Sequence, residues 1–118
     1  MEGQITIDCS EPWYGLIQTK IKPVEGRKGT LTWSAIKKGD IVIFRDPDDH
    51  LKTFKAEVTG INKYTGKDAL DQYLISETLE RALPGVSSVE EGRKIYLQWS
   101  TLEQIEKYGM LGIQIRPI

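Results

Sequence analysis

A lysine, a glutamate and an arginine lie close together in the chain, at Lys22, Glu25 and Arg27. An arginine guanidinium can grip a phosphate or a carboxylate through two parallel N–H bonds, and a lysine adds a point charge beside it. A glutamate in the same cluster can hold the two cations in position, accept from the amino group of cytosine or guanine, or act as a base. Strand alternation places Glu25 and Arg27 on one face, with Lys22 off that face unless the bend at Pro23 re-aims it. The cluster therefore indicates either a binding site or a structural ion pair.

The segment around this cluster is strongly basic, although the formal net charge of the whole chain is only −1. Residues 20–38 hold six Lys or Arg and a single Glu, which gives a local charge of +5. Such a stripe can guide a polyanion to one face of a protein, and a solvated basic edge is the alternative interpretation. The lysines of this approach outside the cluster are Lys20, Lys28, Lys37 and Lys38.

Aromatic side chains near the cluster could stack on nucleic-acid bases. Helical spacing places Trp13 on the same face as two aliphatic residues, so we expect it in the core. Trp99 follows Tyr96 by three residues on a predicted helix, and we expect Trp99 in the core as well. The expected ligand-facing aromatics are therefore Tyr14 and Trp33.

The remaining chemistry is limited by one cysteine and one histidine. Cys9 can form neither an internal disulfide nor a multi-cysteine zinc site, and we expect it to be a buried small hydrophobe. His50 follows an acidic stretch at 46–49 that a turn between two strands explains without a metal. We therefore expect no metal and no cofactor.

Neither a membrane span nor a targeting segment is visible. No apolar run approaches the ~20 residues that cross a bilayer. The first residues lack the basic and apolar regions of a signal peptide. We expect a monomer that is not bound to a membrane, in the cytoplasm or, in a eukaryote, in the nucleus.

Strands and short helices must position these residues. Alternation of apolar and polar residues predicts strands over 4–8, 24–27, 54–59 and 110–116. The apolar run 41–44 predicts a strand covered on both faces, as in a sandwich or a closed barrel. A short helix follows Pro12 and ends before Pro23. Later helices are predicted to start at Thr65, Ser88 and Ser100, and Gly85 and Gly109 stand where helix C-caps would lie. This order predicts one α+β domain over 1–118.

Several of these segments, taken in order, resemble the ASCH domain family. They are the runs at 11–14 (EPWY), 22–27 (KPVEGR), 38–44 (KGDIVIF), 83–85 (LPG), 91–96 and 108–113 (YGMLGI). The resemblance covers nearly the whole chain. It implies a PUA-like fold, which is a small β-barrel of about five to six strands with flanking short helices. It also implies binding of RNA or another nucleic acid.

The resemblance carries the family's lysine, glutamate and arginine onto Lys22, Glu25 and Arg27, whereas its glycine falls on Lys20 and its threonine on Pro23. One branch of the family hydrolyses acylated cytidine with a lysine, a threonine and a glutamate. Lys22 matches that lysine, but the threonine falls on Glu25 and the glutamate has no clear match. Other members are associated with ribonuclease activity or with transcription coactivation.

These observations predict a protein that binds RNA or a nucleotide-like ligand in a basic cleft beside the first helix. Lys22 and Arg27 would contact phosphate, and Glu25 would orient them or read a base edge. The expected ligand-binding residues are Lys22, Glu25, Arg27, Tyr14, Lys20, Lys28 and Trp33. One alternative is a hydrolase of modified nucleosides or of RNA that uses Lys22 and Glu25. The other is a protein-interaction module that presents the acidic helices after residue 67.

Overall fold

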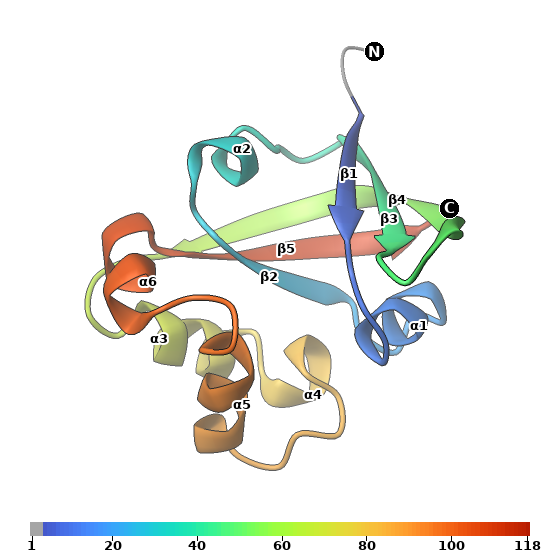
Figure 1. Ribbon diagram of the computed structural model, residues 1–118. Coiled ribbons are helices and arrows are strands. Elements are labelled where there is room, and N and C mark those ends of the chain that lie inside the picture. Colours follow the sequence, from blue (N-terminus) through green and yellow to red (C-terminus); the bar gives the residue numbers. More distant parts are fainter. Residues whose placement is uncertain (1–3) are drawn as a thin grey trace.

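The computed structural model describes residues 4–118, which form one five-stranded sheet flanked by short helices (Figure 1). The sheet order is β1-β3-β4-β5-β2, in which β1 runs parallel to β3 and the other neighbours are antiparallel. The strands are β1 (Ile5–Asp8), β2 (Val24–Lys28), β3 (Ile41–Asp46), β4 (Asp49–Tyr64) and β5 (Met110–Pro117). The α+β class and the presence of five strands agree with the sequence prediction, but β4 extends well beyond the predicted range of 54–59 at both ends.

The sheet curls into a half-barrel and does not close. Within residues 4–118, β1 and β2 are its two edges, and neither is the other's hydrogen-bonded neighbour. We call the gap between these edges the seam. The sheet is therefore a half-barrel and not the expected barrel, but its five strands agree with the expected number of about five to six. The expectation that 41–44 is covered on both faces was also wrong: in β3, Val42 and Phe44 are buried while Ile41 and Ile43 are partly exposed.

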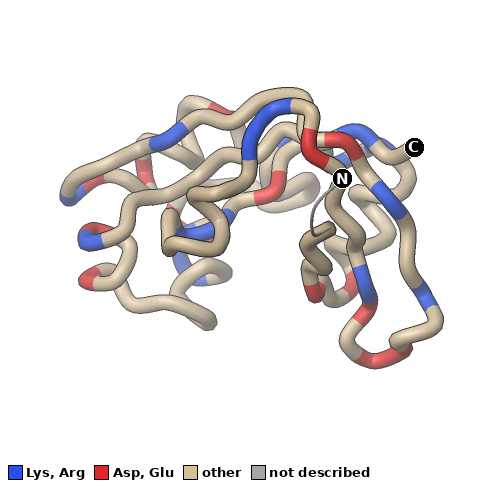
Figure 2. Tube along the Cα trace, turned by 90° about the horizontal axis from the view of Figure 1, so that it is seen from above, with Lys and Arg blue, Asp and Glu red and all other residues tan. Residues whose placement is uncertain are grey.

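The long strand β4 holds the sheet together, because it pairs with β3 along its first part and with β5 along its second. Its register with β5 shifts between Val58 and Gly60, and such a bulge increases the local bend of a strand. The hairpin of β3 and β4 projects from the rest of the trace and carries acidic residues at its tip (Figure 2). The acidic stretch at 46–49 is thus a turn between two strands, as predicted.

Helices cover the sheet from more than one side (Figure 1). In chain order they are α1 (Trp13–Gln18), α2 (Leu31–Ser34), α3 (Ala69–Ser76), α4 (Leu79–Ala82), α5 (Val89–Tyr96) and α6 (Leu102–Tyr108). The Ser88 hydroxyl accepts from the Glu91 amide, which confirms the predicted start of α5. The helix expected from Thr65 starts only at Ala69, because Gly66 has a φ of +92°, which a right-handed helix does not allow. Helix α6 is capped by Thr101 rather than Ser100. None of the helices in the described part of the chain is long and apolar enough to cross a bilayer.

Two hydrophobic clusters lie on the two faces of the sheet. The first fills the concave side and joins strand residues such as Phe44 and Ile113 to Ile17 of α1. The second packs α3, α4, α5 and α6 against β2 and β5 around Tyr73 and Leu74. The glycine of β2, Gly26, faces this second cluster, where a Cβ atom would lie 2.6 Å from the Tyr96 hydroxyl and even closer to that of Tyr73.

The first cluster overturns one aromatic assignment. Tyr14 is buried, with its ring edge-on to Phe54 at 5.0 Å between centroids, whereas Trp13 is only partly buried. The reason is the length of α1: a six-residue helix offers a narrow face, and the pair Tyr14 and Ile17 occupies it. Trp13 is thereby turned toward the seam.

Candidate functional site

A pocket of about 440 Å³ lies at the seam. We call it the seam pocket. It is bounded by the end of β1, by β2, by α1 and α2, and by the segment between α5 and α6. The lining residues are Asp8, Cys9, Ser10, Trp13, Lys22, Glu25, Gly26, Arg27, Lys28, Thr30, Trp33, Pro47, Leu83, Tyr96, Trp99, Ser100, Ile105 and Met110. The volume falls within the range of about 300–1,000 Å³ that is usual for small-molecule sites.

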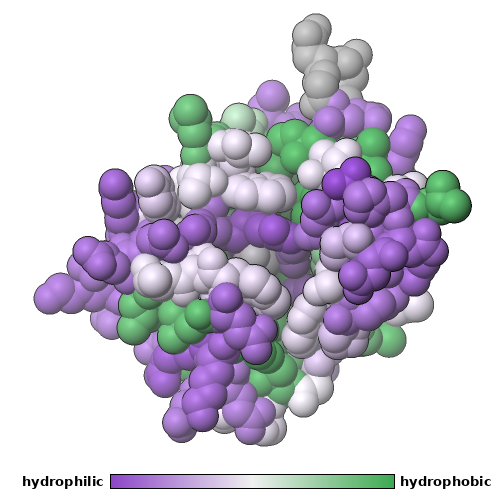
Figure 3. Space-filling view, in the orientation of Figure 1, coloured by the Kyte–Doolittle hydropathy of each residue, from purple (hydrophilic) through white to green (hydrophobic). Residues whose placement is uncertain are grey.

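The walls of the seam pocket are aromatic. All three tryptophans of the chain, Trp13, Trp33 and Trp99, line it, and Tyr96 joins them. Trp99 is 59% exposed and lies after the end of α5, so the expectation that it is a core residue was wrong. In the space-filling view, a hydrophilic band crosses the middle of this face, with atoms of intermediate hydropathy above and below it (Figure 3).

Lys22 lies at the floor of the seam pocket and is only 2% exposed. Its Nζ donates to the carbonyl oxygens of Val24, at 2.6 Å, and of Ala82, and lies 3.7 Å from Oε1 of Glu25. Burial lowers the pKa of Lys22 below its ordinary value of 10.5, and the Glu25 carboxylate opposes that shift. Two carbonyl oxygens therefore accept from the ammonium, and the Glu25 carboxylate pairs with its charge without a hydrogen bond.

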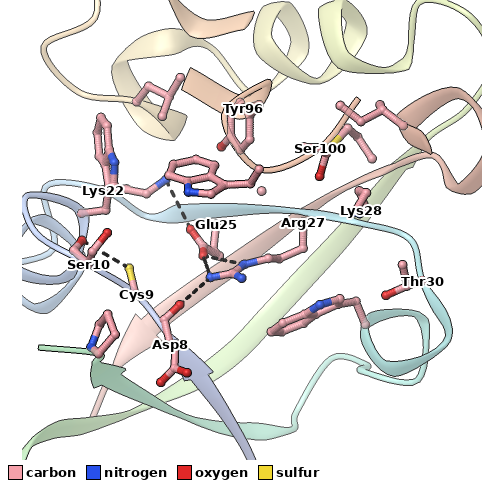
Figure 4. Close-up of a pocket in the computed structure, with 18 residues that line it drawn as sticks. Asp8, Cys9, Ser10, Lys22, Glu25, Arg27, Lys28, Thr30, Tyr96 and Ser100 are labelled. Carbon is pink, nitrogen blue, oxygen red and sulfur yellow. Dashed lines mark hydrogen bonds and ion pairs between the residues drawn. The ribbon is translucent and has the colours of Figure 1, made fainter. Parts of the chain in front are cut away.

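Glu25 and Arg27 face the same side of β2, as alternation requires. Oε2 of Glu25 accepts from Nε of Arg27 at 2.9 Å and from Nη2 at 2.7 Å (Figure 4). Nη2 also donates to the carbonyl oxygen of Asp8 at 3.0 Å, so the arginine joins the two edges of the half-barrel. The guanidinium carbon lies 4.9 Å from the centroid of the Trp33 ring, within reach of a cation–π contact.

Two atoms of this ion pair remain available to a ligand. Among residues 4–118, Nη1 of Arg27 donates to no acceptor, and Oε1 of Glu25 accepts nothing closer than the Lys22 ammonium at 3.7 Å. The ion pair thus leaves one donor, on Arg27, and one acceptor, on Glu25, in a site with aromatic walls.

Cys9 lines the seam pocket with its thiol beside the charged residues (Figure 4). Burial, and then the negative charge of Glu25, raise the pKa of Cys9 to about 12. The thiol is therefore protonated near neutral pH and is a poor nucleophile. The expectation that Cys9 is buried is confirmed, because it is 5% exposed.

The other sequence-predicted residues are divided between the pocket and its surroundings. Lys28 lines the pocket at the end of β2 and donates to Gln104 of α6 at 3.4 Å. Tyr14 lies in the core, and Lys20 is exposed outside the pocket. Lys20 has a φ of +68°, a conformation that favours glycine, at the position where the family resemblance expects one.

Sequence reasoning missed Trp13, Trp99 and Tyr96 as pocket residues. One signal could have found Trp99: it stands just before a helix-start pattern, which places it in a turn and not on a helical face. No comparable signal exists for Trp13, because helical spacing by itself favours the core. His50 is exposed, and no group of three or more possible metal ligands occurs in the described part of the chain.

The fold and the site define an α+β protein with an open half-barrel and a tryptophan-lined pocket at its seam. The chain is similar over nearly its whole length to two solved structures. It shares 35% identity with hypothetical protein PH0355, over 98% of this chain and 100% of that one, with a TM-score of 0.86. It shares 31% identity with protein PF0455 from Pyrococcus furiosus, over 98% of both chains, with a TM-score of 0.77. The chain belongs to the same family as these two proteins. No family model and no curated protein matches it.

Proposed function

We propose that this is an ASCH-type, PUA-like protein that binds single-stranded RNA, or a nucleotide-like ligand, by placing a base in the seam pocket. The observation that carries the proposal is the position of all three tryptophans around the ion pair of Glu25 and Arg27. A base has two apolar faces and a polar edge. Aromatic walls suit the faces, since a base stacked on an aromatic side chain gains about 1–3 kcal/mol.

The ion pair suits the edge of the base. Oε1 of Glu25 would accept from an exocyclic amino group, and Nη1 of Arg27 would donate to a ring nitrogen or a carbonyl oxygen. This pattern favours bases that present an amino donor beside an acceptor, as cytosine, adenine and guanine do. Lys28, on the rim of the pocket, would contact the phosphate attached to that base.

Lys22 has a different role from the one that its sequence position suggested. Its ammonium group is already bonded to two carbonyl oxygens and faces Glu25, and almost none of it is exposed. It is therefore better suited to hold Glu25 in place than to contact phosphate. We assign Lys22 as a positioning residue.

A hydrolase is the second candidate, because a buried lysine of lowered pKa beside a carboxylate is a common feature of active sites. Covalent hydrolysis also needs a nucleophile with an adjacent base. The thiol in the seam pocket is protonated, and Lys22 is engaged with backbone carbonyls. We therefore favour binding over catalysis and expect no efficient hydrolysis of N4-acetylcytidine.

Binding can be measured by fluorescence anisotropy with a labelled eight-nucleotide single-stranded RNA and with its duplex, each at low and at high salt. We expect the single strand to bind more tightly, because its bases are free to enter the pocket. Binding should weaken with salt, since lysines neutralise phosphates. Trp99→Ala should weaken binding about 5- to 150-fold, the equivalent of one lost stack. Tyr108→Ala is the matched control, because Tyr108 is 38% exposed and lies outside the pocket.

Absence of binding at low salt, or full affinity in the Trp99→Ala variant, would contradict the proposal. Loss of the acetyl group from N4-acetylcytidine, abolished by Lys22→Ala, would favour the hydrolase instead.

A further inference from the structure

A second hollow lies next to the seam pocket. Its volume is about 620 Å³, and it is more open than the seam pocket. We call it the basic groove. It runs from α2 and the loop after it, across the second half of β4, to β5. Trp33 lines both hollows, so the two meet at this ring.

Positive charge dominates the basic groove. Lys37, Lys38 and Lys63 line it, and no Asp or Glu does so among the described residues. Lys37 lies 3.8 Å from Asp40. Lys38 and Lys63 have no carboxylate of residues 4–118 within 4 Å. The loop between α2 and β3 accordingly stands out as a blue stretch in Figure 2. Two lysines from separate elements are thus free to meet an anion.

The rest of the groove suits the backbone of a nucleic acid better than its bases. Trp33, at the end shared with the seam pocket, is the only aromatic residue among the described residues that line the groove. Hydroxyl and amide side chains, such as Ser34, Thr59 and Gln114, offer donors and acceptors for ribose and phosphate. Such a surface cannot stack a base, but it can neutralise and solvate a sugar–phosphate chain.

We infer that the basic groove holds the sugar–phosphate backbone of a single-stranded RNA whose base occupies the seam pocket. The inference rests on the proposed function and narrows its ligand class: the ligand is an oligonucleotide, not a free nucleoside or mononucleotide. The strand passes over Trp33, and its next phosphates lie against Lys38 and Lys63.

The test measures how the affinity depends on the length of the ligand and on the positive charge of the groove. Cytidine monophosphate and RNA strands of two, four and eight nucleotides are titrated against the wild type, with tryptophan fluorescence as the readout. We expect affinity to rise with length until both hollows are filled. Lys38→Gln and Lys63→Gln should each make the slope of log affinity against log salt shallower by about 0.7 for the eight-nucleotide strand. This change in slope corresponds to binding about fivefold weaker than that of the wild type at 0.1 M salt. Their affinity for the mononucleotide should not change.

Lys55→Gln is the matched control, because Lys55 is exposed on the same strand, β4, but lines neither hollow. If the mononucleotide binds as tightly as the eight-nucleotide strand, the inference is wrong while the proposed function stands. If Lys55→Gln weakens RNA binding as much as Lys63→Gln does, the inference is also wrong, because the attraction would then come from the overall positive charge and not from the groove. Competition by oligoglutamate as strong as by RNA would assign the groove to an acidic protein segment. If no nucleotide or strand binds, both proposals fall.

Discussion

Replacing Glu25 by glutamine should destabilise the protein in a way that depends on pH. The substitution keeps the shape of the side chain but removes the carboxylate nearest to a fully buried ammonium group, which lies 3.7 Å away. Removing one partner of a buried ion pair typically costs about 3–5 kcal/mol, because it leaves an unpaired charge. Arg27 adds less to this loss than Lys22, since its side chain is 28% exposed and keeps its hydrogen bond to the Asp8 carbonyl oxygen.

The stability lost in the Glu25→Gln variant has an upper limit, because Lys22 can release its proton instead of remaining charged and unpaired. At pH 7, deprotonating a lysine of ordinary pKa 10.5 costs about 5 kcal/mol, at 1.36 kcal/mol per pH unit. The two carbonyl acceptors of Lys22 remain in place, so we expect a loss of about 3 kcal/mol. For a chain of this size, that corresponds to a fall in Tm of roughly 10 °C.

The sign of the pH dependence follows from proton binding. In the variant, the pKa of Lys22 in the folded state lies further below 10.5, so the unfolded state binds more protons between these two values. Stability therefore rises with pH across that window. The difference in the free energy of unfolding between variant and wild type should therefore shrink from pH 7 toward pH 10. Other titrating groups affect both proteins equally, so their contributions cancel in this difference.

Chemical denaturation at pH 7, 8, 9 and 10 measures this difference. Glu57→Gln is the control, because Glu57 pairs with Arg116 on the surface and its loss should cost under about 1 kcal/mol. Lys22→Met combined with Glu25→Gln should lose less stability than the sum of the single variants. The reasoning is refuted if Glu25→Gln unfolds like the wild type at pH 7, or if its deficit does not change with pH.

Three further outcomes are expected. Gly26→Ala should lower stability by about 1–3 kcal/mol in a denaturant titration, because the added methyl group overlaps two tyrosine hydroxyls; a neutral effect would mean that β2 shifts freely. Iodoacetamide at pH 8 should label Cys9 only as fast as the protein unfolds, since its pKa is about 12 and it is buried; rapid labelling of the folded protein would contradict this. Lys20→Gly should increase the free energy of unfolding by up to about 1 kcal/mol, and so raise Tm, because φ at this position is +68°. A lower Tm would show that the lysine side chain makes a stabilising contact.

Local patterns in the sequence were enough to place the strands and part of the site. Alternation put Glu25 and Arg27 on one face of β2, and in the structure they are hydrogen-bonded. The bend at Pro23 brings Lys22 to within 3.7 Å of the same carboxylate. These features depend on neighbours in the chain, which is why spacing could predict them.

Features that depend on distant parts of the chain could not be predicted. Gly60 looks like a strand end, but a shift in register against β5 lets β4 continue to Tyr64. The choice between Trp13 and Tyr14 as the core residue depends on how a six-residue helix sits against Phe54. Whether the half-barrel closes depends on lateral pairing between β1 and β2, which no local pattern encodes.

The open seam also bears on self-association. An unpaired strand edge is a template on which another chain can add a strand, and this is a common route to aggregation. Here β1 is only four residues long, and β2 places the charged pair Glu25 and Arg27 beside its free edge. Short edge strands and inward-pointing charges both discourage strand addition. The residues that shape the seam pocket are therefore also of the kind that disfavours strand addition at these edges. Replacing them with apolar residues should favour such addition.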